Sequence, residues 1–295
     1  MRKYAIITDS TSDLEKSVRN QYDIDYVAMN YIINDVEYVA SLDWESHSAK
    51  EFYDIMRKGT RVFTTQVPRV AYEEKFREWL DKEYDIIYIS CSSALSSSIN
   101  TARIVADELK KEYDAAKIYC IDSLISSLGQ GYLAMLASDL RKEGKSIDEV
   151  SDAIEGCKLC VNQVGTVGSL EYLRRAGRVK ASSAFFGDLF GVKPIIISDR
   201  IGQNYAYKKV KGLNNSRRAI AEDIKEAADG IYENLYISHA DCLADAEAVR
   251  DEILKIAPFK NVHIDTIRPI VGASVGPGTI IVFCHGKEVT IEGKE

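Results

Sequence analysis

The sequence predicts an α/β protein of two domains: an N-terminal parallel-sheet α/β/α domain over residues 1–158, and a C-terminal mixed-sheet α/β domain over residues 159–295. A length of 295 residues suits about two domains of ordinary size. Strand and helix signals alternate through the first half, as in sheets built by right-handed crossovers. In the second half strands outnumber helices, and adjacent strands imply antiparallel pairing. No Gly/Ser/Pro linker marks the boundary, so we expect tightly packed domains with a cleft between them.

The first half repeats a strand-helix unit. The polar segment 8–13 follows an apolar run and can cap the helix after it, and a proline ends an irregular loop at 63–68. In chain order the expected elements are a strand at 4–7, a helix at 14–22, hairpin-like extended structure at 27–39, helices at 49–57 and 70–82, a strand at 85–90, a helix at 99–109, a strand at 117–121 and a helix at 124–141. These units predict a parallel sheet with helices on both faces.

The second half is richer in strands. Its expected strands are 163–168, 192–198, 205–210, 235–239, 262–269, 280–284 and 288–291. Its expected helices are 170–176, 215–232 and 245–257. This mixture predicts a mixed sheet.

Composition excludes several classes of protein. The chain is 46% hydrophobic and 28% charged, as in an ordinary globular protein rather than a disordered or coiled-coil one. Lys and Arg total 38 against 45 Asp and Glu, so the net charge is −7. Such a chain has no overall positive field to attract nucleic acid or an anionic membrane surface. We therefore expect neither a nucleic-acid partner nor a stable membrane anchor.

The start of the chain and its cysteines predict a cytoplasmic protein. The first apolar stretch is too short for the core of a signal peptide, and no apolar run is long enough for a membrane span. The six cysteines lie mostly in apolar surroundings, which is typical of buried thiols in a reducing compartment. Cys157 and Cys160 have the spacing of half a zinc site, but no second pair completes it, so we expect no metal. We also expect no cofactor, because the phosphate-binding glycine motifs are missing.

Two hydroxyl-rich segments are candidates for binding an anion. Residues 90–98 hold six serines in nine positions, between a strand and a helix. This placement puts Ser96, Ser97 and Ser98 at a helix N-terminus beyond the carboxyl end of a parallel strand, where α/β sheets bind anions. Thr64 and Thr65 form a second hydroxyl-rich loop. Alone, each segment would be a weak signal.

Residues 272–276 fit the G-x-S-x-G pattern around a hydrolase nucleophile, which would make Ser274 catalytic. The surroundings argue against this reading, because such a serine should precede a helix and then an acidic residue and a histidine in that order. Here Pro277-Gly278 leads into a strand, so a Gly-rich turn is the better interpretation. A serine hydrolase that uses Ser274 remains the alternative function, and we expect no other catalytic residue. His239-Ala240-Asp241 after a strand is best explained as a helix cap.

Six ordered segments resemble the DegV family of bacterial fatty-acid-binding proteins over essentially the whole chain. The matching segments are Asp9-Ser10-Thr11-Ser12-Asp13-Leu14, Thr64-Thr65-Gln66, the serines from Ser92 to Ser98, Asp122-Ser123 through Gly131, Gly168-Ser169-Leu170-Glu171-Tyr172-Leu173 through Arg178, and Gly272 through Gly278. The resemblance implies two domains with a fatty acid in a tunnel between them. It also implies a non-catalytic carrier, without a cofactor, that presents the bound acid to the catalytic subunit of a separate ATP-dependent fatty-acid kinase. That kinase makes acyl phosphate for phospholipid synthesis.

Carried over by position, the resemblance implies a set of residues around the carboxylate of a long-chain fatty acid. Thr64 and Ser96 would bond the carboxylate, the Ser97 amide would donate to it, and Thr65 or Ser93 would lie close by. Arg178 would lie at the tunnel mouth or at the partner contact. Ser274 stands where the family has a histidine, and Ser97 where it has a glycine. Serine donates a hydrogen bond but has a shorter reach than histidine and cannot become a cation, which bears on carboxylate affinity and its pH dependence. The apolar residues 185, 186, 189 and 190 are candidates to line the tunnel, although an ordinary core is the alternative.

Overall fold

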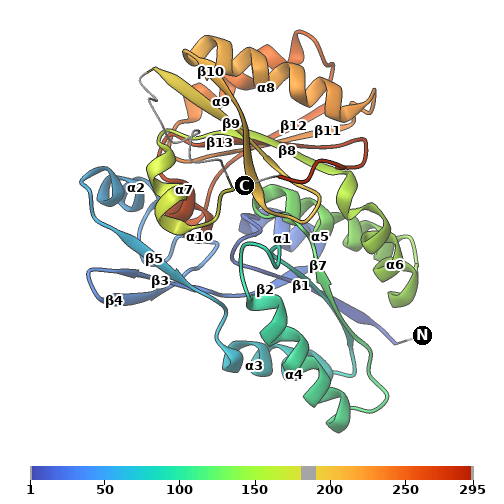
Figure 1. Cartoon of the computed structure of the whole chain (residues 1–295). Helices are drawn as coiled ribbons and strands as arrows, with labels where there is room; N and C mark the ends of the chain where they lie inside the picture. The colour runs from blue at the N-terminus through green and yellow to red at the C-terminus, as the bar shows by residue number, and fades with distance from the viewer. Residues whose placement is uncertain (1, 181–190, 294–295) are drawn as a thin grey trace.

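The computed structural model describes residues 2–180 and 191–293 (Figure 1). Its first sheet, sheet A, has four parallel strands in the order β2-β1-β6-β7. They are β1 (Tyr4–Asp9), β2 (Ile24–Val27), β6 (Asp85–Ser90) and β7 (Ile118–Asp122). Around them lie α1 (Lys16–Tyr22), α3 (Arg69–Leu80), α4 (Ser98–Glu112), α5 (Ser127–Lys142) and α6 (Ile147–Cys157). The parallel sheet expected for the first half is confirmed.

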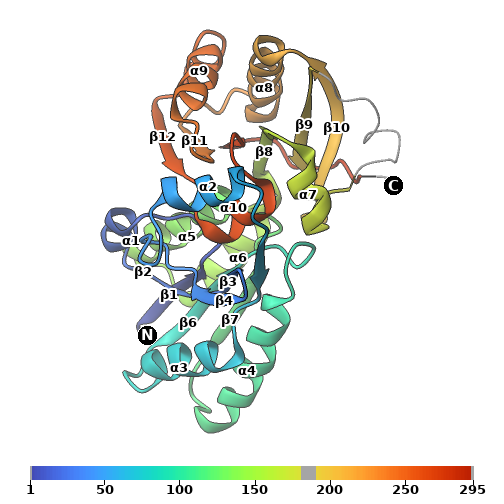
Figure 2. The ribbon, with the colours of Figure 1, turned by 90° about the vertical axis from the view of Figure 1, so that its left-hand side faces the viewer.

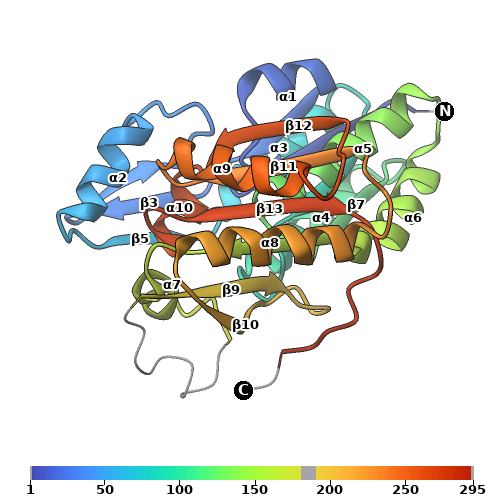
Figure 3. The same ribbon diagram turned by 90° about the horizontal axis from the view of Figure 1, so that it is seen from above.

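The second large sheet, sheet C, is mixed. It has six strands in the order β10-β9-β8-β13-β11-β12, of which only β11 and β12 pair in parallel. They are β8 (Val161–Thr166), β9 (Val192–Ser198), β10 (Asn204–Lys211), β11 (Asn234–His239), β12 (Asn261–Thr266) and β13 (Ile280–His285). Helices α8 (Leu213–Ala228) and α9 (Leu243–Leu254) cover its outer face (Figure 3). The mixed sheet expected for the second half is confirmed.

A small third sheet, sheet B, is formed by strands that lie between β2 and β6 in the chain. It contains β3 (Asn30–Ile33), β4 (Val36–Val39) and β5 (Val62–Thr65) in the antiparallel order β4-β3-β5. Two more helices, α2 (Ala49–Arg57) and α10 (Pro269–Val275), lie between the levels of sheets A and C in Figure 2, and α2 lies at the outer edge of the molecule in Figure 1. Beside α10 lies α7 (Leu170–Ala176), and the short 3₁₀ turn η1 (Lys158–Cys160) precedes β8.

Buried side chains join the two halves of the chain. One apolar cluster contains residues of sheet A, such as Ile7 and Ile87, together with Ile196, Ile281 and Phe283 from the inner face of sheet C. A second cluster fills the space between sheet C and its two outer helices. The domain boundary expected after residue 158 stays a prediction, because the two halves of the chain share one apolar cluster.

A polar cluster is enclosed at the same junction. Asp13 accepts hydrogen bonds from the Arg268 amide at 2.8 Å and from the Ser127 hydroxyl at 2.5 Å, and Ser127 Oγ lies 2.9 Å from Ser238 Oγ. Burial raises the pKa of Asp13 to about 7, while the Arg268 cation opposes the shift. A protonatable carboxyl therefore links the loop between β1 and α1 to the start of α10.

Several expected elements need correction. The polar segment 8–13 does not cap α1: the helix begins at Lys16 after Glu15, without a side-chain cap. The strand expected at 288–291 is absent: the Val289 amide donates to the Leu159 carbonyl in η1, and the Ile291 carbonyl accepts from the Arg200 amide in a turn. Asp241 does not cap α9 but pairs with Arg57 of α2.

The structure contains two helices that the sequence analysis did not predict, α6 and α10. The capping box of Ser146 and Glu149 starts α6, and that S-x-x-E pattern is visible in the sequence. The other is α10, which begins at Pro269, where the sequence predicts the end of a strand. Proline favours the first turn of a helix because its missing N–H would have no partner there.

No helix in the part of the chain that the structure describes is long and apolar enough to cross a membrane.

Candidate functional site

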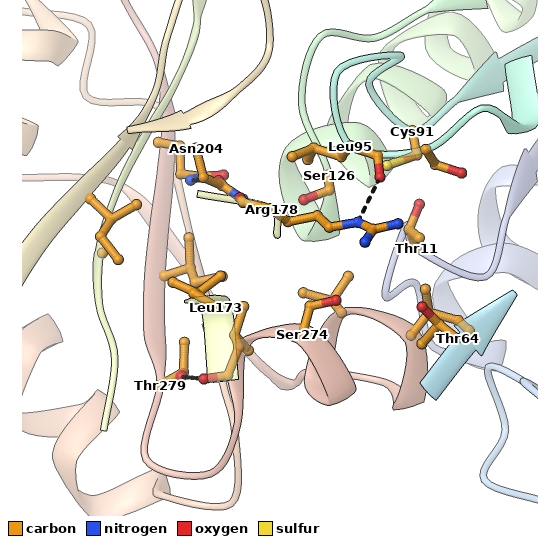
Figure 4. A pocket seen from close by; sticks show the side chains of 18 of the residues that line it. Thr11, Thr64, Cys91, Leu95, Ser126, Leu173, Arg178, Asn204, Ser274 and Thr279 are labelled. Atoms are coloured by element: carbon orange, nitrogen blue, oxygen red, sulfur yellow. Dashed lines mark hydrogen bonds between the residues drawn. The ribbon is translucent and has the colours of Figure 1, made fainter. Parts of the chain in front are cut away.

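A cavity of about 290 Å³ lies between the N-terminal elements and the inner face of sheet C (Figure 4). This volume is near the lower end of the range of about 300–1,000 Å³ for small-molecule pockets. Its apolar lining is Met29, Cys91, Leu95, Gly165, Val167, Leu173, Ile196, Ile270, Val271, Val275 and Ile281. Its polar lining is Thr11, Thr64, Thr65, Gln66, Ser96, Ser97, Ser126, Gln163, Thr166, Arg178, Asn204, Ser274 and Thr279. The cavity thus combines apolar walls with many hydroxyl and amide groups.

The serine-rich segment forms the turn between β6 and α4. Ser96 Oγ accepts a hydrogen bond from the Ser98 amide at 3.3 Å and lies 2.9 Å from Ser98 Oγ. Ser98 Oγ in turn accepts from the Val67 amide at 3.2 Å, which ties this turn to the segment after β5. Neither the hydroxyl nor the amide of Ser97 bonds to any described residue. A helix N-terminus with an unused donor therefore faces the cavity, as an anion site requires.

Thr64 and Thr65 lie at the end of a strand, where the sequence predicts a loop. Thr64 pairs with Tyr31 and Thr65 with Asn30, because β3 offers β5 a complete antiparallel edge. The hydroxyl of Thr65 reaches the carbonyl of Asn30 at the limit of 3.5 Å. The hydroxyl of Thr64 has no partner among the described residues, so it can donate to a ligand.

Ser274 lies in the last turn of α10 and not in a Gly-rich turn. Gly272 lets this helix pack closely, since a Cβ there would stand 2.6 Å from the Tyr53 hydroxyl. The helix precedes the serine instead of following it, so the arrangement is not a nucleophile elbow. The Ser274 hydroxyl hydrogen-bonds to no histidine within the described ranges. Nothing in this geometry supports the serine-hydrolase alternative.

Arg178 lines the same cavity. Its Nε donates to the Leu95 carbonyl at 3.2 Å, and a terminal nitrogen donates to the Ala176 carbonyl. Figure 4 shows its side chain extending across the pocket toward Thr11 and Cys91. The residue is still exposed, so a single guanidinium faces both solvent and the cavity.

Ser98, also predicted at the anion-binding helix end, does not line this cavity, and neither does Ser93. The Ser93 side chain is exposed, and its amide donates to Asp122 Oδ1 at 3.1 Å. The structure therefore brings together Thr64, Thr65, Ser96, Ser97, Ser274 and Arg178, and leaves Ser93 and Ser98 outside. The apolar candidates at 185, 186, 189 and 190 lie outside the described residues.

Sequence reasoning missed the buried carboxylate beneath the cavity. Asp9 accepts hydrogen bonds from the amides of Thr11 and Cys91, at 2.9 and 3.0 Å, and from the Tyr88 hydroxyl at 2.9 Å. These bonds hold two cavity-lining residues in place. Burial and the Asp9 charge raise the pKa of the Cys91 thiol, which disfavours the reactive thiolate. The signal was present in the polar segment 8–13, which begins within β1 and was predicted to cap the following helix.

Sequence reasoning also missed two amides on sheet C, Gln163 and Asn204. Gln163 stands beside the equally polar Asn162 in β8, so no sequence pattern sets it apart. No group of three His, Cys, Asp or Glu side chains that could hold a metal ion occurs within residues 2–180 and 191–293.

The fold and the cavity define an α/β protein with a pocket, lined by hydroxyl groups, between a parallel and a mixed sheet. A family model described as "Uncharacterised protein, DegV family" matches residues 3–286, so the chain belongs to the DegV family. It is 34% identical to a DegV domain-containing protein of Clostridium perfringens, over 97% of this chain and 98% of the relative.

Solved structures agree with this assignment. The DegV family protein from Thermus thermophilus, described by its fatty acid binding, superposes with a TM-score of 0.87 at 25% identity, over 97% of this chain and all of that one. DegV of Bacillus subtilis, described as a fatty acid binding protein, gives 0.83 at 26% identity with the same coverage of 97% and 100%. The resemblance inferred from six sequence segments is confirmed.

Proposed function

We propose that this protein binds a long-chain fatty acid and presents its carboxylate to a separate ATP-dependent kinase, which forms acyl phosphate. The observation that carries the proposal is the convergence of hydroxyl groups from β5, the start of α4 and α10 on one partly apolar cavity. A carboxylate is stabilised by hydroxyl and amide donors at a helix N-terminus. Fatty-acid binding by two DegV relatives points to the same ligand.

The tail and the head of the ligand have separate roles. Each methylene that enters a dry apolar cavity contributes up to about 0.8 kcal/mol, so the tail supplies most of the affinity. Thr64, Ser96 and Ser274 would hold the carboxylate, with the amide of Ser97 as a further donor. Arg178 supplies a positive charge in the same cavity, a role that the serine at position 274 cannot fill.

Presentation to a kinase is the finer part of the proposal. The exposed Arg178 supports it, because a carboxylate bound beside a solvent-facing side chain can be reached by a second protein. The chain carries no G-x-x-x-x-G-K-[ST] loop for nucleotide phosphates. We therefore assign the binding of ATP, the phosphate donor, to the separate kinase.

Mass spectrometry of the denatured purified protein tests the binding step. We expect one long-chain fatty acid per chain, or saturable binding after delipidation. If neither native extraction nor titration yields a stoichiometric acid, the proposal fails. Incubation with the kinase, ATP and fatty acid tests the second step: acyl phosphate should form only when this protein is present. A fluorophosphonate probe that labels Ser274 would instead favour the hydrolase.

A further inference from the structure

Two side-chain amides face the cavity from sheet C. Gln163 of β8 and Asn204 of β10 both line it. Residues alternate between the two faces of a strand, so Gln163 lies on the same face as Val161 and Val167, which belong to the core between the halves. Gln163 is only 5% exposed. A buried amide therefore lines a cavity to which we assign the tail of a lipid.

The hydrogen bonds of this pair define which atom of Gln163 faces the ligand. Asn204 Nδ2 donates to the Arg178 carbonyl at 3.0 Å, and a carbonyl can only accept. Asn204 must therefore turn Oδ1 toward Gln163, whose Nε2 donates to it at 3.0 Å. This network determines which end of each side-chain amide is oxygen and which is nitrogen. It leaves Gln163 Oε1 pointing away from Asn204.

Gln163 Oε1 has no hydrogen-bond partner among the described residues. The oxygen is not fully enclosed either: the described residues contain a few polar atoms that have neither accessible surface nor a partner, and Gln163 Oε1 is not one of them. Because the residue as a whole is buried, the accessible surface of this oxygen lies against the cavity. A plain alkyl chain would displace water from the oxygen without replacing its hydrogen bond, which is unfavourable.

We propose that the preferred ligand is a hydroxy fatty acid, whose chain hydroxyl donates a hydrogen bond to Gln163 Oε1. This inference rests on the proposed function and specifies its substrate class. An acceptor needs a donor, so a keto group does not satisfy it, whereas a hydroxyl does. Thr64 and Asn204, the hydrogen-bond partner of Gln163, lie on opposite sides of the pocket in Figure 4, so we assign the hydroxyl to the chain and not to the head group.

The test compares affinities of the delipidated protein for octadecanoic acid, mid-chain hydroxyoctadecanoic acids and the matching oxo acids. We expect the best hydroxy acid to bind about tenfold more tightly than octadecanoic acid, which corresponds to about 1.4 kcal/mol. The oxo acid should show no such gain. If all hydroxy acids bind no better than octadecanoic acid, the inference is overturned while the proposed function stands. If no acid binds at all, both fail.

Variants separate the role of Gln163 from general effects on the cavity. Gln163→Leu should abolish the preference for the hydroxy acid and retain or improve octadecanoic acid binding, because it replaces the unsatisfied oxygen with methyl groups. Gln21→Leu on the exposed face of α1 is the matched control and should leave the ratio of the two affinities unchanged. A Gln163→Leu protein that binds octadecanoic acid but keeps the hydroxyl preference would contradict the assignment of Oε1.

Discussion

At the scale of single residues, two of the hydroxyls proposed to hold the carboxylate, those of Thr64 and Ser96, have different structural roles. Ser96 Oγ bonds to the amide of Ser98 and lies beside its hydroxyl, so it also orders the start of α4. Thr64 has no hydrogen-bond partner for its hydroxyl among the described residues. The two side chains should therefore respond differently when each hydroxyl is removed.

We expect Thr64→Val to weaken fatty-acid binding and to leave the stability of the ligand-free protein unchanged. Ser96→Ala should weaken both. A hydrogen bond to a charged group contributes about 1.5–3 kcal/mol, and loss of a helix-cap contact costs about 1 kcal/mol. Calorimetric titration and thermal unfolding of the same preparations measure the two quantities.

Ser93→Ala is the matched control for these variants, since Ser93 is exposed and lies outside the cavity. It should alter neither affinity nor stability. An affinity of the Thr64→Val protein equal to that of the wild type would remove Thr64 from the carboxylate site.

Ser274→His should tighten fatty-acid binding severalfold. Imidazole reaches further than a hydroxyl, and its charged form makes a stronger bond to a carboxylate. The gain should be larger near pH 6 than near pH 8, because histidine ionises with a pKa of about 6.5. The larger ring would instead weaken binding if it collided with close-packed neighbours. An affinity that is unchanged at both pH values would mean that residue 274 does not contact the head group.

Asp13 should make the stability of the fold fall as the pH rises. Burial raises its pKa from 3.8 to about 7, so the folded state holds a proton that the unfolded state has released. That stabilisation is complete below pH 3.8 and is lost as the pH approaches about 7. One such proton changes the free energy of unfolding by up to about 1.4 kcal/mol per pH unit.

Urea unfolding of wild-type and Asp13→Asn proteins between pH 5 and pH 8 measures this effect. The difference between the two proteins is the relevant quantity, because the histidines also titrate. Burial lowers the pKa of His239 and of His285, which makes stability rise with pH, the opposite of the Asp13 effect, in wild type and variant alike. Parallel curves for the two proteins would show that Asp13 does not titrate in this range.

At the scale of elements, α10 is the helix that delivers Ser274 to the cavity, and its position depends on close packing. The Tyr53 side chain of α2 is completely buried, and its hydroxyl donates to the Ile267 carbonyl at 2.7 Å. A Cβ at Gly272 would stand 2.6 Å from that hydroxyl and 3.2 Å from the Phe52 ring. Only a glycine lets the two helices approach this closely.

Gly272→Ala should destabilise the protein by about 1–3 kcal/mol, because the methyl group forces neighbours in a close-packed region to move. Chemical denaturation measures the loss. Gly156→Ala on α6 is the matched control: nothing lies within 4 Å of its Cβ position, so alanine should stabilise that helix by about 0.5–1 kcal/mol. Equal effects of the two substitutions would refute the packing argument.

At the scale of the whole molecule, the cavity lies where the two halves of the chain meet. Its lining combines Thr11, Thr64 and Ser96 from the first half with Gly165, Ile196 and Ser274 from the second. A ligand held there contacts both halves and binds the folded state only.

A fatty acid present at about one hundred times its dissociation constant should therefore stabilise the protein by about 2.7 kcal/mol. We expect the melting temperature to rise by several degrees in a thermal-shift assay with delipidated protein. Alkanes of equal length should give a smaller rise, because they lack the carboxylate. A melting temperature that does not move at any fatty-acid concentration would contradict binding in this cavity.

The sequence alone determined the fold class, the family and most of the cavity's hydroxyl groups. Apolar runs of strand length that alternate with helical periods are local patterns, so the parallel sheet A and the mixed sheet C could both be inferred from them. The six family segments placed Thr64, Ser96 and Ser274 on one site. Arg178 was predicted at the tunnel mouth or at the partner contact, and it lines the cavity in the structure.

Only the tertiary structure decided the arrangements that depend on neighbours distant in the chain. Thr64 became part of a strand because β3, some thirty residues earlier, provides its hydrogen-bond partners. Asp9 became a buried acceptor because Tyr88 and Cys91 come from another strand and its loop. Gln163 faces the cavity through its carbonyl oxygen because Asn204 and the Arg178 backbone orient it. Local sequence carries no information about such contacts, because residues far apart in the chain meet only when the sheets pack.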